Sequence, residues 1–141
     1  MELLKDIAVD LNIYESIEYT KTILDDKYFK EFIEVYIKIK NDNRLNKYKL
    51  LSLGCFDEDS ISLDFGINKC NDSWIILHIM FNDESFDNKT SYMVQVYNHF
   101  KNSYNRYSLI YYENFTDALD CIFVELEKRD KLLEVFNNQN K

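Results

Sequence analysis

The chain has 141 residues, a formal net charge of -8 and an aromatic fraction of 16%. This length and composition predict a single domain, residues 1–141, with its own hydrophobic core and a frayed tail at 137–141. The excess of acids disfavours direct contact with nucleic acid or with an anionic membrane surface, and it favours a basic protein partner.

Glycine and proline are scarce. Proline is absent, and the two glycines are Gly54 and Gly66. Glycine-rich phosphate loops and G-x-S-x-G elbows are therefore excluded, and turns must be built from Asn and Asp. Cys55, Cys70 and Cys121 form no C-x-x-C motif. They predict reduced thiols in a cytoplasmic protein, and the sequence has no pattern of a signal peptide, lipid anchor or membrane span.

The first forty residues carry helical patterns of different strength. Apolar residues at helical spacing predict a short helix over 3–11, whereas 13–24 is ambiguous between helix and strand. A broad apolar stripe predicts a well-buried helix over 26–40, with Asp25 or Asp26 as its N-cap.

Between residues 47 and 112 the hydrophobic period changes to two, which predicts five strands. Their ranges are 47–54, 60–67, 74–81, 90–97 and 106–112. Short connections make sequential strands antiparallel neighbours in a meander. Because 74–81 is apolar on both faces, we expect it to be central and covered on both sides, or nearly so.

A long C-terminal helix completes the predicted fold. It starts at Asn114, with Asp117 three residues on in the manner of a capping pair, and its apolar stripe begins at Phe115 and continues through Leu126. We expect this stripe to pack on the sheet. The predicted class is α+β: N-terminal helices, a five-stranded antiparallel meander and a C-terminal helix packed on it.

The acidic stretch FDEDSISLDFG, residues 56–66, first suggests a calcium loop. Counted from Asp57, however, Ile61 and Ser62 occupy the positions that need an oxygen ligand and a glycine, so the EF-hand pattern fails. A solvated hairpin turn fits better, and we expect no metal and no cofactor.

An enzymatic alternative uses the pattern of a metal-dependent hydrolase or nuclease. Asp64 lies in a strand, and Asp87 and Lys89 supply an acid-x-Lys pair downstream. This pair flanks a turn instead of lying mid-strand beside Asp64. We therefore expect no catalytic residues, and this hydrolase remains the alternative.

The chain has two histidines that could act in catalysis or bind a metal. His78 lies in an apolar strand, which favours a hydrogen-bonded structural role, and His99 lies in a loop. The spacing predicts no zinc site. A Cys121–His78 dyad stays open at this point, although Cys121 falls at the edge of a helical apolar stripe.

The meander order predicts where the acids meet. Alternate connections lie at the same end of an antiparallel sheet, so 55–59, 82–89 and 113–117 share one end, which is strongly acidic. The opposite end, with turns 68–73 and 98–105, is close to neutral. Tyrosines in the last strands add contact area suited to a protein interface. The predicted partner-binding residues are Asp57, Glu58, Asp59, Asp83, Glu84, Asp87, Glu113, Tyr111 and Tyr112.

In its overall style the chain resembles the immunity proteins of bacterial toxin–immunity systems, with contact-dependent growth inhibition immunity proteins as the nearest type. The shared features are small size, acidity, the absence of proline, reduced cysteines and no catalytic signature. The resemblance implies a cytosolic protein that blocks a basic toxin, often a nuclease. Phage-encoded inhibitors such as anti-CRISPR proteins share this style and are a second interpretation. A third is an adaptor domain that oligomerises through the tyrosine-rich last strand.

Overall fold

The computed structural model describes residues 11–45, 49–66, 73–98 and 106–139. Within these ranges the fold is α+β: helices precede a five-stranded antiparallel sheet, and a C-terminal helix packs on that sheet. The strand order is β1-β2-β3-β4-β5, which confirms the predicted meander.

The N-terminal helices are α2, Leu11–Ile23, and α3, Asp26–Asn41, followed by a short 3-10 turn at Asn43–Leu45. The ambiguous segment 13–24 is therefore helical. Asp25 caps α3 as predicted, because its carboxylate accepts a hydrogen bond from the Lys27 amide at 3.1 Å. The helix predicted over 3–11 lies outside the described residues except for Leu11.

The strands lie close to their predicted ranges, because alternating apolar residues and Asn/Asp-rich breaks mark them clearly. Their bounds are β1 Lys49–Asp57, β2 Ser60–Gly66, β3 Ser73–Asp83, β4 Lys89–Asn98 and β5 Arg106–Tyr112. A 3-10 turn at Glu84–Phe86 joins β3 to β4. Asp87 and Asn88 follow it with φ of 56° and 61°, which confirms that Asp and Asn make left-handed turns here.

The last helix, α4, spans Phe115–Gln139 and so continues into the stretch 137–141 that was expected to fray. Asn114 caps it, since its Oδ1 accepts a hydrogen bond from the Thr116 amide at 2.8 Å. Residues Ala118, Ile122 and Leu126 are fully buried along one face. This confirms that the predicted apolar stripe packs against the sheet.

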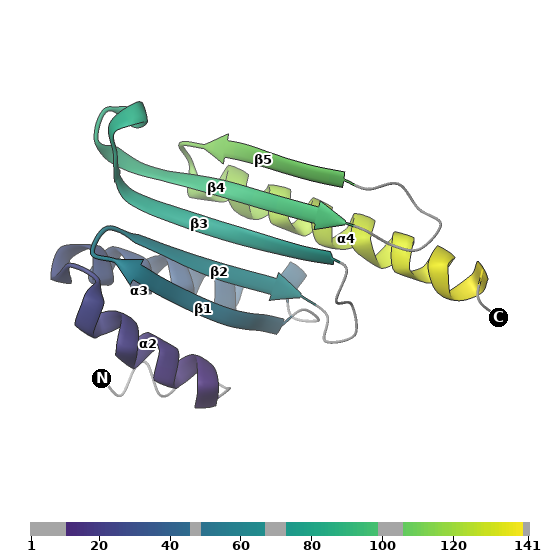
Figure 1. The fold of residues 1–141 in the computed structure, drawn as a ribbon, viewed down its shortest axis with the longest axis horizontal. Coiled ribbons are helices and arrows are strands. Elements are labelled where there is room, and N and C mark those ends of the chain that lie inside the picture. Colours follow the sequence, from purple (N-terminus) through teal and green to yellow (C-terminus); the bar gives the residue numbers. More distant parts are fainter. Residues whose placement is uncertain (1–10, 46–48, 67–72, 99–105, 140–141) are drawn as a thin grey trace.

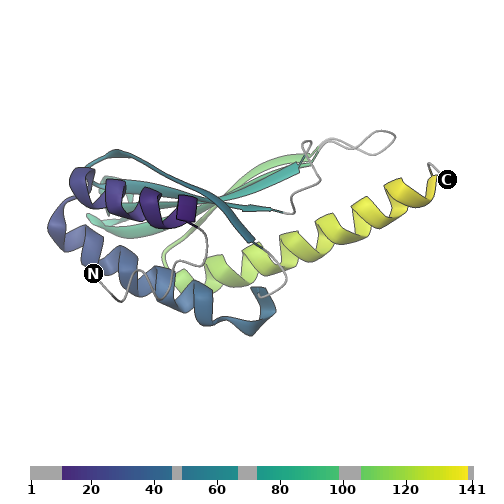
Figure 2. The same cartoon turned by 90° about the horizontal axis from the view of Figure 1, so that it is seen from below.

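The layers are clear in two views. Figure 1 shows the sheet in front of α3 and α4, and Figure 2 shows both helices on one side of the sheet with α2 alongside β1. In β3, Ile75, Leu77 and Ile79 face α3 and α4 and are fully buried. The side chains between them are half-buried, and no described helix lies over their face. The strand order confirms the expected central position of 74–81. Among the described elements, however, helices cover only one face of this strand.

Cross-strand register organises both faces into rows. Leu53, Leu63, Leu77 and Val94 lie opposite one another and form the middle of the core, beneath the helices. The neighbouring row lies on the uncovered face, which we call the open face. It runs through Gly54, Ser62, His78, Met93 and Tyr111.

Candidate partner-binding surface

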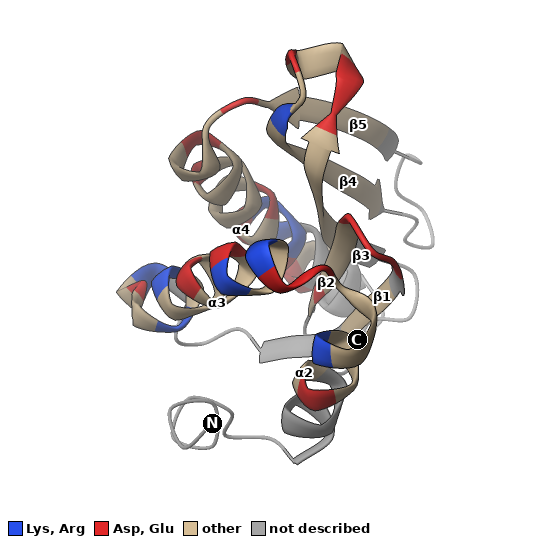
Figure 3. Ribbon diagram, turned by 90° about the vertical axis from the view of Figure 1, so that its left-hand side faces the viewer, with Lys and Arg blue, Asp and Glu red and all other residues tan. Residues whose placement is uncertain are grey.

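The fold gathers acidic connections at one end of the sheet. The β1–β2 turn, the β3–β4 connection and the β5–α4 connection all lie there, as antiparallel order requires. The start of α3 adds Asp25 and Asp26, and Figure 3 looks onto this acidic end. The opposite turns, 68–73 and 98–105, fall almost entirely outside the described residues.

Backbone hydrogen bonds hold the β1–β2 turn in place. The amide of Asp25 donates to the carbonyl of Glu58, and the amide of Phe81 donates to the carbonyl of Asp59, each at 2.9 Å. Tyr28 of α3 also stacks on Phe81, with ring centroids 5.1 Å apart. The acidic turn is therefore anchored to α3 on one side and to β3 on the other.

The predicted acids differ in their exposure to solvent and in their hydrogen bonds. Asp83 is partly buried, and its two carboxylate oxygens accept hydrogen bonds from Ser91 Oγ at 2.6 Å and from the Ser85 amide at 2.9 Å. This pattern makes Asp83 a structural residue of the β3–β4 connection. The acids among the predicted set that are exposed are Asp57, Glu58, Glu84, Asp87 and Glu113.

Basic residues at this end are few among the described residues. Lys89 starts β4, opposite Asp83. Lys27 follows the α3 cap, and its Nζ lies 4.8 Å from the centroid of the Tyr28 ring. Acids therefore outnumber bases among the described residues of this surface, so its electrostatic potential is negative.

The two predicted tyrosines point to opposite faces. Tyr111 is 53% exposed and lies on the open face, directly opposite Met93. Tyr112 packs against the core, and a hydrogen bond with the Cys121 thiol raises the pKa of its hydroxyl to about 12. Of these two tyrosines, Tyr111 is the one that is exposed on the open face.

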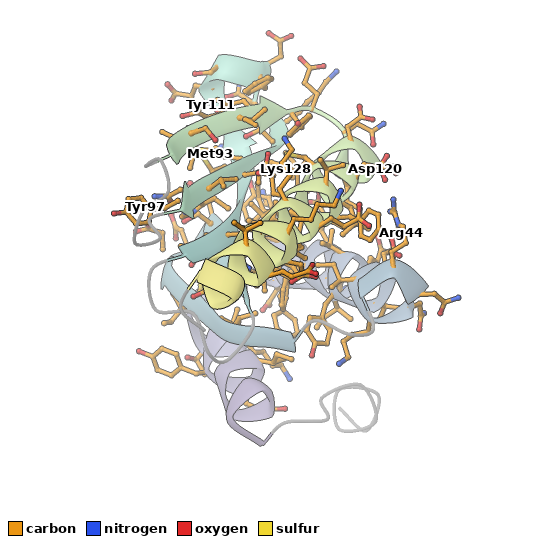
Figure 4. All side chains as sticks on the ribbon, turned by 90° about the vertical axis from the view of Figure 1, so that its right-hand side faces the viewer. Arg44, Met93, Tyr97, Tyr111, Asp120 and Lys128 are labelled. Carbon is orange, nitrogen blue, oxygen red and sulfur yellow. The ribbon has the colours of Figure 1, made fainter. Side chains whose placement is uncertain are left out.

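The open face is a mixture of apolar and polar side chains. Figure 4 shows Met93, Tyr97 and Tyr111 on the side of the sheet away from α4. His78 belongs to the same face, where one ring nitrogen, Nε2, lies 2.9 Å from Gln95 Oε1. The expected hydrogen bond of this histidine is confirmed, but it lies on the open face instead of in the core.

In the hydrolase alternative, Asp64 lies far from Asp87 and Lys89. Asp64 lies opposite Ile76, whereas Lys89 lies opposite Asp83, seven residues farther along β3. At the usual rise of a strand this separation is about 23 Å. Within the described residues no cluster of three or more His, Cys, Asp or Glu side chains is arranged to hold a metal ion.

Asp64 is nevertheless unusual. Its Oδ1 is buried and accepts no hydrogen bond from the described residues. Burial raises the pKa of this carboxyl, and the positive charge of Arg129 opposes that change.

The thiol and histidine candidates are also separated. Cys121 packs with the core on the helix side, whereas His78 lies on the open face, so the two do not form a dyad. Cys55 is buried in β1, where its Sγ lies 3.3 Å from the carbonyl oxygen of Asp57, and burial raises the pKa of its thiol. Cys70 and His99 lie outside the described residues.

Two arginines join segments that are distant in the sequence. Arg129 of α4 is fully buried, and its Nη1 donates to the Phe65 carbonyl at 3.4 Å. Arg44 pairs with Asp42 at 2.9 Å and with Asp120 at 2.8 Å, which joins the end of α3 to α4. Helical spacing could have revealed Arg129, because it falls three residues after Leu126 on the apolar stripe.

Among the described helices, none has the length and apolar character that a bilayer span requires. Comparisons of the chain with protein-family models, with curated proteins and with solved structures found no match.

Proposed function

We propose that this chain is an immunity or inhibitor protein, which binds and neutralises a cognate basic toxin, most fittingly a nuclease, through its acidic end. The observation that carries the proposal is the convergence of exposed carboxylates from separate connections on one anchored surface, at Asp57, Glu58, Glu84, Asp87 and Glu113. A nuclease lines its substrate cleft with Lys and Arg to neutralise phosphates. An acidic surface competes for the same cleft and is steered to it by charge.

The open face supports a contact that is larger than the charged loops alone. Tyr111 lies one residue before the end of β5, next to the acidic end, and Met93 lies beside it. Interfaces combine an apolar, aromatic centre with a polar rim. In this arrangement the carboxylates steer the partner, and Tyr111 supplies contact area.

The decisive experiment begins with the genes that flank this one: a flanking gene that encodes a basic toxin or nuclease domain is co-expressed with the full chain. We expect the full chain to protect growth and to form a complex with the purified toxin domain. Failure to protect growth and to bind would overturn the proposed function.

Charge reversal tests whether the exposed acids steer the partner to the acidic end. The triple variant Asp57→Lys, Glu58→Lys, Glu84→Lys reverses exposed charges at the acidic end. We expect its association rate with the toxin domain at low salt to fall by about tenfold or more, and the difference to shrink as salt rises. Stopped-flow or surface-based kinetics measure this directly.

A matched control carries the same change in net charge elsewhere. Glu34→Lys, Glu127→Lys and Glu134→Lys alter exposed acids on α3 and α4, away from the acidic end. This variant should keep most of the association rate. Equal slowing of both triple variants would show that net charge, and not the acidic end, guides the partner.

A further inference from the structure

The two edge strands of the sheet differ in whether another element covers them. At the β1 edge, α2 packs along the strand (Figures 1 and 2), and Ile17 and Thr20 of α2 are buried, as is Leu24 directly after it. At the other edge, no described element lies beyond β5. An uncovered edge strand presents backbone N–H and C=O groups to any strand that can pair with them.

The β5 edge also lacks the usual protection against pairing. Its sequence, RYSLIYY, has no Pro, no Lys and a single charged residue at its first position, Arg106. Its seven pairs with β4 run without a register shift, whereas the β1–β2 pairing is interrupted twice. Bulges, charges and proline are the common devices that blunt an edge. The β5 edge is therefore regular and ready to pair.

Exposed apolar side chains follow the same strand. Leu109 is 42% exposed and Tyr111 is 53% exposed, and alternation places both on the open face. Among the described residues of the sheet, these two are the most exposed large hydrophobic side chains. A strand added beyond β5 would stand directly beside them and cover part of this surface.

We propose that β5 pairs antiparallel with β5 of a second copy of this chain, centred on Leu109, so that one continuous sheet runs through both copies. In this register Leu109 lies opposite its own counterpart, and Tyr111 lies opposite residue 107 of the second copy. The two-fold axis makes the contact self-complementary, as in a closed dimer.

Charge favours a second copy over a basic partner at this edge. No residue of β5 is acidic, so a basic partner is drawn to the acidic end instead. Antiparallel pairing also directs the two acidic ends away from each other, because each lies beyond Tyr112 of its own copy. Each chain carries a net charge of -8, and a parallel arrangement would bring the two acidic ends together.

The size of the contact sets the expected affinity. Pairing through one seven-residue strand is a small interface, and small interfaces of under about 1,200 Å² are typical of weak complexes. We therefore expect a monomer–dimer equilibrium in the micromolar range. Sedimentation velocity of the full chain across a concentration series should show it.

The test variant is Leu109→Lys, which places two like charges at the two-fold axis without touching the core. We expect dimerisation to weaken by about tenfold or more. Tyr19→Lys is the matched control, because Tyr19 is a 64% exposed aromatic residue on α2, at the opposite edge. This control should dimerise like the unmodified chain, and circular dichroism should show that both variants are folded.

Mixing two variants tests the register. Leu109→Glu alone should also fail to dimerise, but an equimolar mixture of Leu109→Lys with Leu109→Glu should regain a dimer through opposite charges at the axis. The proposal is overturned if the unmodified chain stays monomeric at all concentrations, if Leu109→Lys dimerises normally, or if the mixture does not associate. A dimer disrupted equally by Tyr19→Lys would point to a different surface.

Discussion

Alternate residues of β3 meet two different environments. Leu77 is fully buried between β2, β4 and the helices, whereas Ile76 and His78, its neighbours in sequence, are half-buried on the open face. Both faces of this strand are rich in apolar atoms. Helix coverage, and not apolar content alone, therefore separates the face that stabilises the fold from the face that is available for contacts.

The largest expected difference between the faces comes from truncating neighbouring aliphatic residues. Leu77→Ala should lower the free energy of unfolding by about 3 kcal/mol, because it leaves a cavity in the middle of the core. Ile76→Ala, on the half-buried face, should cost about 1 kcal/mol. Urea denaturation of both variants at low protein concentration measures the pair. Equal losses would mean that the open face is packed as tightly as the core.

The hydroxyls of two adjacent tyrosines should contribute differently to the stability of the fold. Tyr112→Phe removes the hydroxyl that bonds to the Cys121 thiol and should cost about 1 kcal/mol of stability. Tyr111→Phe removes an exposed hydroxyl on the other face and should change stability by under about 0.5 kcal/mol. Thermal unfolding separates the two. A larger effect at Tyr111 would contradict the assignment of faces.

The smallest expected effect concerns Asp64. Burial raises the pKa of this carboxyl, so the folded state disfavours its ionised form. The loss of folding stability that comes from ionising buried Asp64 is absent well below the ordinary pKa of 3.8. It is complete once the pH exceeds the raised pKa of the folded state. Asp64→Asn should therefore be more stable than the unmodified chain at neutral pH, and the difference should vanish as the pH falls below 3.8.

A control for the loss of a charge is Glu34→Gln, which removes an exposed acid from α3. At neutral pH its stability should differ from that of the unmodified chain by under about 0.5 kcal/mol. If Asp64→Asn lost stability at neutral pH, attraction between Asp64 and Arg129 would outweigh the effect of burial.

Most of the fold could be predicted from the sequence, because its signals are local. Alternation and Asn/Asp breaks marked the strands, Asp25 and Asn114 marked two helix starts, and short connections implied the meander. The shared end of the acidic connections followed from that topology. These features depend only on neighbours along the chain and on antiparallel order.

The remaining features depend on contacts between distant segments. The sequence of 74–81 is apolar on both faces, and nothing in it shows that α3 and α4 lie on the same side. The structural role of Asp83 depends on a hydrogen bond that it accepts from Ser91 on the next strand. The opposite directions of Tyr111 and Tyr112 follow from simple alternation, and that signal was present in the sequence.

The anchoring of the β1–β2 turn has a consequence for the entropy of association. The carbonyls of both turn residues, Glu58 and Asp59, accept hydrogen bonds from outside the hairpin. A partner that binds here would meet a backbone already ordered by folding, and it would not have to immobilise a loop. Slow hydrogen exchange at the amides of Asp25 and Phe81, which donate these bonds, would report that order in the free protein.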